Sequence, residues 1–136
     1  MKKKTLCIIQ ARLSSSRLPG KILLKGDGKN SLLATLYKRL TPSKHIDKII
    51  IATSTEKIDD IVNDECKKNN INVFRGSLKN VLKRYYECAK KFKGDTIIRI
   101  TSDCPLIEYK LIDKLLLKYN NENCDYLSNV HPATFP

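Results

Sequence analysis

The residues best suited to chemistry lie in one segment near the N-terminus, Ile8 to Lys21, which reads IIQARLSSSRLPGK. It begins as an apolar run and changes character at Gln10, after which come cations, three serines and a Pro-Gly pair. Arginine side chains pair with phosphate oxygens through parallel N–H groups, lysine supplies a point charge, and hydroxyls and loop amides add donors. A strand that ends in such a loop is suited to holding a polyphosphate.

An ordinary basic surface loop is the alternative for this segment. Two arginines, Arg12 and Arg17, and Lys21 within ten residues exceed what a simple connection needs. The segment has neither the G-x-x-x-x-G-K-[ST] pattern of P-loops nor the G-x-G-x-x-G pattern of dinucleotide-binding folds. The phosphate interpretation therefore depends on the residue types and on their position after a strand.

A second candidate is Asp103, which closely follows the apolar run Ile97 to Ile100. A carboxylate at the end of a parallel strand is a natural Mg²⁺ ligand, since Mg²⁺ prefers one or two carboxylates together with substrate phosphates. The alternative is a capping residue for the turn that begins at Pro105. The spacing alone leaves both open.

A third candidate is the group Arg75-Gly76-Ser77, which follows a short apolar stretch. It could donate to a base or a ribose, or it could be a helix cap preceded by a surface arginine. The two histidines, His45 and His131, have no partner at metal-ligand spacing, and we expect both to be ordinary loop residues.

Strand-like and helix-like segments alternate along the chain. Strands are predicted at 5–11, 48–53, 72–74, 96–101 and 126–127, with a short apolar piece at 22–24 and a turn at 26–28. Four helices are predicted: the first runs from Asn30 or Ser31 to Leu40, and the last covers about 108–120. The second begins at Ser54 or Thr55, and its predicted inner face is Ile58, Ile61, Val62 and Cys66. The third is capped by Ser77, and its predicted inner face is Leu78, Val81, Leu82, Tyr85, Ala89 and Phe92. This alternation predicts right-handed βαβ units and a parallel sheet, in which ligands bind at the carboxyl ends of the strands.

The composition indicates one globular domain. The 136 residues are 41% hydrophobic and 29% charged, and no apolar run approaches the ~20 residues of a membrane-spanning helix. The apolar segment behind the basic N-terminus has no cleavage site, so we expect a cytoplasmic protein without a membrane partner. The five cysteines form no C-x-x-C pair, and we expect reduced thiols with Cys7, Cys66 and Cys88 in the core.

The formal net charge of +12 raises the possibility of a nucleic-acid partner. Most of the 26 basic residues are lysines scattered over predicted helix surfaces, without interleaved aromatic residues. We therefore expect a solvated surface. A non-enzymatic basic module for RNA or an acidic polymer remains the alternative, and it predicts steep salt dependence without selectivity among mononucleotides.

Four blocks carry a resemblance to a known family: IIQARLSSSRLPGK, FRGSLKNVLKRYYECAK (74–90), IIRITSDCPLI (97–107) and DYLSN (125–129). In this order and spacing they resemble the cytidylyltransferases that activate acidic and related sugars. These include CMP-sialic acid and CMP-Kdo synthetases and, most closely, the spore-coat polysaccharide biosynthesis type. The resemblance covers nearly the whole chain.

The resemblance implies a Rossmann-like, GT-A-like α/β fold of nucleotide-diphospho-sugar transferases, with three layers and a mainly parallel sheet. It implies Mg²⁺-dependent transfer of CMP from CTP to a sugar or sugar acid, with release of pyrophosphate, for a surface polysaccharide or glycan. Another sugar-nucleotide pyrophosphorylase or a GT-A-like glycosyltransferase is the alternative within enzymes.

Family members continue well past the position of Pro136, and that further stretch supplies a second metal-binding Asp, much of the sugar pocket and the homodimer contacts. We therefore expect residues 1–136 to form a single nucleotide-binding domain, the N-terminal part of such an enzyme. It should bind CTP with weak or no turnover.

By motif position, the resemblance also implies roles for individual residues. The triphosphate would be held by Arg12, Ser14, Arg17 and Lys21, the cytidine by Gln10, Ala11 and Arg75 with Ser77 nearby, and Mg²⁺ by Asp103; Arg12, Lys21 and Asp103 would be catalytic. One departure concerns Asn80, where the family pattern has Asp; the amide keeps a hydrogen-bonding side chain and loses the charge.

Overall fold

A computed structural model describes residues 3–13, 18–131 and 133 of the chain. The elements in chain order are β1 (Thr5–Gln10), the 3-10 helix η1 (Lys21–Leu23), α1 (Leu32–Leu40), β2 (Lys48–Ser54), the 3-10 helix η2 (Lys57–Asp59), α2 (Asp60–Lys68), β3 (Asn72–Gly76), α3 (Val81–Phe92), β4 (Thr96–Thr101) and α4 (Tyr109–Asn121). The predicted alternation of strands and helices is confirmed.

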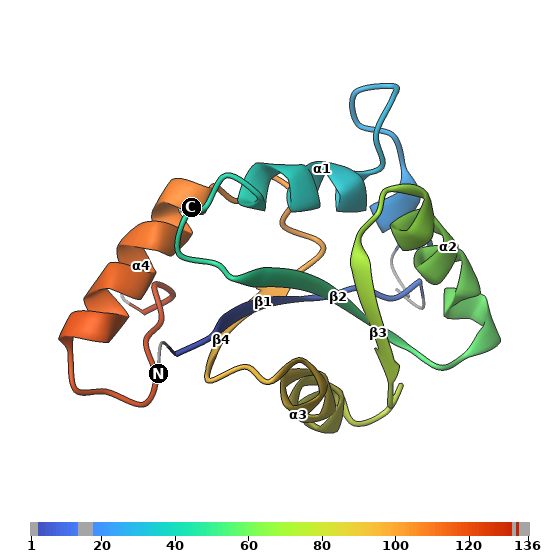
Figure 1. The fold of residues 1–136 in the computed structure, drawn as a ribbon. Helices are drawn as coiled ribbons and strands as arrows, with labels where there is room; N and C mark the ends of the chain where they lie inside the picture. The colour runs from blue at the N-terminus through green and yellow to red at the C-terminus, as the bar shows by residue number, and fades with distance from the viewer. Residues whose placement is uncertain (1–2, 14–17, 132, 134–136) are drawn as a thin grey trace.

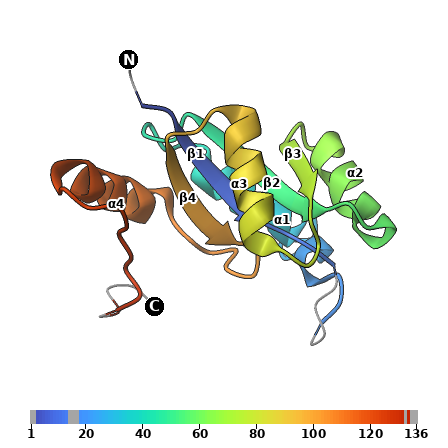
Figure 2. The same cartoon turned by 90° about the horizontal axis from the view of Figure 1, so that it is seen from below.

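The four strands form one parallel sheet in the order β3-β2-β1-β4. Helices α1, α2 and α4 lie on one face and α3 lies on the other, which gives three layers (Figures 1 and 2). The predicted α/β fold with a parallel sheet is therefore confirmed. Because all strands run the same way, their carboxyl ends share one edge of the sheet.

The core has two halves because side chains alternate along each strand. On β1, Cys7 and Ile9 pack among residues of α1, α2 and α4. The intervening Leu6 and Ile8 pack against α3 together with Ile50 and other residues of β2. Both faces of β1 are thus buried, as expected for an inner strand of a covered parallel sheet.

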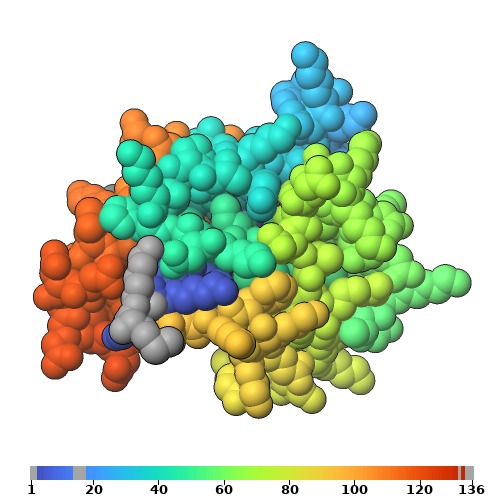
Figure 3. Space-filling view, viewed as in Figure 1, coloured from blue at the N-terminus to red at the C-terminus, as the bar shows by residue number. Residues whose placement is uncertain are grey.

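The segment between η1 and α1 is the turn predicted at 26–28. The Asp27 carboxylate accepts hydrogen bonds from the backbone N–H groups of Lys29 and Asn30, at 2.9 and 2.6 Å. This turn stands out from the body of the molecule beyond α1 (Figure 3). Helix α1 then begins after Ser31, whose hydroxyl accepts from the Ala34 N–H at 3.1 Å and confirms one of the two predicted caps.

The second helix begins later than predicted, and its inner face differs. The expected start at Ser54 or Thr55 is wrong, because Ser54 ends β2 and the first helical turn is η2. Ile58 is 58% exposed and Ile61 is 51% exposed, whereas Asp59 is fully buried. The carboxylate of Asp59 has buried hydrogen-bond partners that turn it inward, and Ile58 consequently faces outward.

The third helix is capped by Asn80 rather than by Ser77 as predicted. The Asn80 side chain accepts from the Lys83 N–H at 2.8 Å, while the Ser77 hydroxyl accepts from the Asn80 N–H at 3.0 Å and shapes the preceding loop. Leu82, expected to face inward, is 80% exposed because it lies about 100° around the helix from Val81.

The strand predicted at 126–127 is absent from the described residues. These residues instead line a groove against β4 and α4 without joining the sheet. An apolar pair can form a strand only where it pairs with a free edge through backbone hydrogen bonds, and this segment makes no such ladder. Within the described residues, β4 is therefore an edge strand.

The cysteines are all free thiols, as predicted. Cys7, Cys66 and Cys88 are fully buried, and burial raises the pKa of each thiol to about 12. Cys104 is exposed and Cys124 is partly exposed. No helix among the described residues is long and apolar enough to cross a membrane.

The difference in exposure between the three buried thiols and the other two predicts selective alkylation, because the thiolate is the reactive form. In the folded protein at pH 8, iodoacetamide should modify Cys104 and Cys124 and leave the three buried thiols untouched. Intact-mass measurement should show two adducts in buffer and five in guanidinium chloride. A double variant with Cys104→Ser and Cys124→Ser is the control and should show none in buffer; three or more adducts on the folded wild type would contradict the burial of these thiols.

Candidate functional site

The predicted site segments meet at the carboxyl edge of the sheet. The loop after β1, the end of β2, the end of β3 and the loop after β4 all leave the sheet there. Hydrogen bonds continue past the strands: the Ser102 N–H donates to the Gln10 carbonyl at 3.0 Å, and the Ala11 N–H donates to the Ala52 carbonyl at 3.1 Å. The loops after β1 and β4 therefore begin at fixed positions.

Lys21 is positioned by the turn that precedes it. Gly20 has φ 71°, in the left-handed region that glycine adopts without strain, and it begins η1 with Lys21 as first residue. The Lys21 ammonium lies 3.9 Å from a carboxylate oxygen of Asp103, which follows β4. The structure thus brings together two of the predicted site residues from opposite ends of the sequence.

Asp103 is half-exposed and is held in its charged form. The Thr101 hydroxyl, by hydrogen bonding, makes the largest contribution to lowering the pKa of the Asp103 carboxyl below its ordinary value, and the Lys21 charge adds to this. The hydrogen bonds described for the Asp103 carboxylate come from the Thr101 hydroxyl, the backbone N–H of Asp103 and the Cys104 thiol, at 3.9 Å for the last, and none of them comes from the turn that begins at Pro105. An ionised, accessible carboxylate beside a lysine can bind a cation that a phosphate also contacts.

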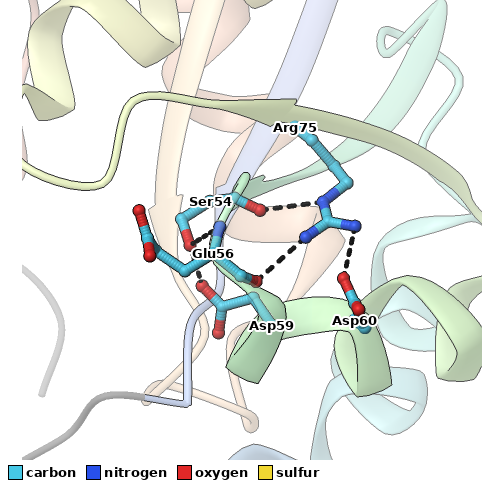
Figure 4. A network of polar contacts seen from close by, with 5 residues as sticks. All are labelled: Ser54, Glu56, Asp59, Asp60 and Arg75. Carbon is cyan, nitrogen blue, oxygen red and sulfur yellow. Dashed lines mark hydrogen bonds and ion pairs between the residues drawn. The ribbon is translucent and has the colours of Figure 1, made fainter.

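Asp59 fixes the start of the loop after β1 through hydrogen bonds. Its fully buried carboxylate accepts a hydrogen bond from the Leu13 N–H at 2.8 Å and another from the Ser54 hydroxyl (Figure 4). The first contact is to the loop after β1 and the second is to the end of β2. A single carboxylate therefore fixes the backbone next to Arg12.

Arg75 lies apart from the Lys21–Asp103 pair and contacts the loop after β2. Its guanidinium donates to the carbonyls of Ser54 and Glu56 at 2.9 and 3.0 Å and pairs with Asp60 at 2.6 Å (Figure 4). These contacts join β3 to the start of α2. Arg75, which is predicted to contact cytidine, is therefore bonded to other groups of the protein in this structure.

The loop between β3 and α3 is held from inside by Arg84. One terminal nitrogen of this buried guanidinium, Nη1, donates to the Ser77 carbonyl at 2.6 Å. The predicted cytidine residues Gln10 and Ala11 lie at the end of β1, where Gln10 is partly buried and Ala11 is fully buried. Arg12, next in the chain, is exposed. The remaining predicted phosphate contacts, Ser14 and Arg17, lie outside the described residues.

Asp59 and Arg84 are site-building residues that the sequence interpretation missed. Asp59 carried no signal that distinguishes it from Asp60, since both are acids in a first helical turn. Arg84 carried one: it occurs at helical spacing between Val81 and Cys88, and a cation on an apolar helical stripe is unusual.

Comparison with known proteins identifies the family. The sequence profile of the family described as Cytidylyltransferase matches residues 6–135. The chain belongs to the cytidylyltransferase family. This assignment confirms the resemblance drawn from the four sequence blocks, and the members of this family are enzymes.

Relatives and structures agree with this assignment. The chain is 40% identical over 125 residues to the spore coat polysaccharide biosynthesis protein SpsF of Bacillus subtilis, covering 89% of this chain and 52% of that protein. It is 37% identical over 126 residues to a 3-deoxy-manno-octulosonate cytidylyltransferase of Fusobacterium nucleatum, covering 90% and 48%. A cytidylyltransferase structure from Leptospira borgpetersenii superimposes with a TM-score of 0.84 at 38% identity, covering 90% of this chain and 51% of that one. The chain thus spans about half the length of the relatives that it matches.

The Asp59 contacts predict an unequal effect of two neighbouring substitutions. Asp59→Ala leaves the buried Leu13 N–H and the Ser54 hydroxyl without an acceptor, and we expect the free energy of unfolding to fall by about 2–4 kcal/mol. Asp60→Ala is the matched control: it removes a half-exposed ion pair with Arg75 and should cost under about 1 kcal/mol. Urea unfolding followed by circular dichroism measures both. Equal losses would contradict the anchoring role of Asp59.

Proposed function

We propose that the protein to which this chain belongs transfers CMP from CTP to a sugar acid and releases pyrophosphate, and that this chain supplies the CTP-binding part. The observation that carries the proposal is the pairing of Lys21 with Asp103 at the edge where β1 and β4 end. The Fusobacterium nucleatum relative, named as a cytidylyltransferase for 3-deoxy-manno-octulosonate, supports a sugar acid as acceptor. We assign most of the acceptor pocket and the homodimer contacts to the part of the longer relatives that this chain does not span.

In the proposed reaction, an acceptor hydroxyl oxygen attacks the α-phosphorus of CTP. The new P–O bond forms as the bond from the α-phosphorus to the bridging oxygen breaks, and that electron pair leaves with pyrophosphate. The hydroxyl proton is lost to solvent or a base. Such a reaction is accelerated mainly by holding the groups in line and by neutralising the charge on the departing oxygens. Arg12 and Lys21, with Ser14 and Arg17 by motif position, are the residues to which we assign this charge neutralisation.

We propose that Asp103 is the Mg²⁺ ligand of this chain. The donor chemistry fits, because Mg²⁺ takes one or two carboxylates and completes its shell with substrate phosphates and water. The described residues contain no cluster of three or more His, Cys, Asp or Glu side chains that would hold a metal alone. Bound there, Mg²⁺ would polarise the phosphoryl oxygens. Lys21 would keep the carboxylate oriented toward the phosphate loop.

Calorimetric titration with CTP and UTP in Mg²⁺ tests the proposed nucleotide site. The wild-type chain should prefer CTP, and Arg12→Ala should weaken CTP binding by about 10- to 100-fold through loss of a charge-assisted contact. Arg99→Ala is the matched control, because Arg99 is an exposed arginine within β4, and it should bind like the wild type. A folded wild-type chain that ignores CTP, or an Arg12→Ala variant that binds normally, would contradict the proposal.

The same titration with and without Mg²⁺ tests the role of Asp103. The wild type should bind CTP more tightly in Mg²⁺ than in EDTA, and Asp103→Asn should remove most of that gain. In EDTA the variant should bind at least as tightly as the wild type, since a negative charge near the triphosphate has been removed. Glu108→Gln, a half-exposed acid bound to Arg39, is the control. An undiminished Mg²⁺ effect in Asp103→Asn would contradict the assignment.

A further inference from the structure

Arg84 has more hydrogen-bonding capacity than the fold uses. Its side chain has no exposed surface, and Nη1 donates to the Ser77 carbonyl, which is the one partner of the guanidinium among the described residues. Nε and Nη2 are buried with no hydrogen-bond partner among the described residues. Burial first, and then the charge of Arg12, lowers the pKa of this guanidinium. Burying a charged donor without an acceptor is costly, so these two donor nitrogens require an explanation.

Gln10 carries a matching acceptor on the same face of the sheet. Its side-chain oxygen Oε1 is also buried and without a partner among the described residues. Leu6 and Ile8 of β1 face α3, and because side chains alternate along a strand, Gln10 faces α3 as well. Thr53, which also has an unpartnered buried oxygen, alternates to the opposite face and is not part of this set.

Gly76 allows the Arg84 side chain to pass beneath the end of β3. A Cβ atom at position 76 would lie 3.1 Å from Arg84 Cγ and 2.8 Å from a ring carbon of Phe74. Gly76 pairs with Ser54 at the carboxyl end of the sheet, and the Ser77 carbonyl that Arg84 contacts comes next. Arg84 therefore lies directly under the loop to which the cytidine pocket is assigned.

The unpartnered atoms are two donor nitrogens, Nε and Nη2 of Arg84, and one carbonyl acceptor, Oε1 of Gln10. The edge of cytosine presents the complement, an amino donor at N4 and acceptors at N3 and O2. Uracil reverses two of the three positions, with an acceptor at O4 and a donor at N3. A planar guanidinium fork is well suited to two neighbouring acceptors, and unpaired polar groups make such a site reject the wrong pattern strongly.

We propose that Arg84 and Gln10 read the pyrimidine edge of CTP, with the Arg84 fork donating to N3 and O2 and Gln10 Oε1 accepting from the N4 amino group. This inference rests on the proposed CTP site and adds the residues that distinguish CTP from UTP. Because Arg84 has no exposed surface, the base reaches it only when a covering segment moves aside. Cytosine is then enclosed on the α3 side of the sheet edge, while Arg12 and Lys21 hold the phosphates.

Calorimetric titration of four chains with CTP and UTP tests this inference. The variants are Arg84→Met, which keeps length without donors, Gln10→Leu, and the control Arg99→Met on the exposed part of β4. Wild type and control should prefer CTP by at least about tenfold. Arg84→Met should weaken CTP binding by about 10- to 100-fold, leave UTP binding nearly unchanged, and bring the two affinities within about threefold. Gln10→Leu should reduce the preference in the same direction.

A nucleotide analogue tests the same contact on the unaltered protein. In 3-deaza-CTP a C–H group replaces N3, so the wild type should bind it about tenfold more weakly than CTP. The Arg84→Met variant should bind the two equally. If Arg84→Met fails to fold, the analogue on the wild type and the Gln10→Leu variant still decide the matter.

The outcomes separate the two proposals. A folded Arg84→Met chain that keeps the wild-type preference for CTP, or a wild type that binds 3-deaza-CTP as tightly as CTP, would overturn the base-reading role while the CTP site stands. A folded wild type that binds neither CTP nor UTP would overturn the proposed function and this inference with it.

Discussion

The central strand β1 hydrogen-bonds in parallel to β2 on one side and to β4 on the other, and every part of the candidate site depends on this pairing. The ladder continues past the strand, through the Gln10 carbonyl toward Ser102 and the Ala11 N–H toward Ala52. Loops from distant parts of the sequence are thereby brought within contact distance, as with Lys21 and Asp103. The backbone of the sheet, rather than the site side chains, sets the relative positions of the charged groups.

Around this frame, charge is divided between an interior and an exposed set. Asp59 and Arg84 are buried and hold backbone: Asp59 the loop after β1, and Arg84 the loop after β3. Arg12 and Asp103, by contrast, are exposed to solvent. Burying a charge is costly, so the buried pair needs the backbone partners that it contacts. The exposed charges interact with water and remain accessible from solvent.

The fold class, the alternation of strands and helices along the chain, and the sheet edge at which the candidate residues meet could all be predicted from the sequence. Hydrophobic periodicity reveals the elements, and the rules of parallel sheets place the loops that follow the strands at one edge. What escaped prediction depended on tertiary partners. Asp59 turns inward only because Leu13 and Ser54 offer donors, and this reversed the expected burial of Ile58. Asn80 rather than Ser77 caps α3 because the intervening loop is held by its own hydrogen bonds. The two apolar residues at 126–127 have the composition of a strand. They do not form one among the described residues, because a strand also needs a neighbouring strand with which to form backbone hydrogen bonds.

The register of the sheet also has a consequence for how the chain folds. Thr5 pairs with Thr96, so β1 acquires its neighbour β4 only after the long intervening segment has been synthesised. Sheets dominated by such distant contacts form slowly, because the chain must close a long loop before the contacts compensate for it. During synthesis, one edge of the apolar run Cys7 to Ile9 remains without its β4 partner until residue 101 has emerged. A strand that is covered on both faces in the folded protein is therefore open to misassociation in the nascent chain.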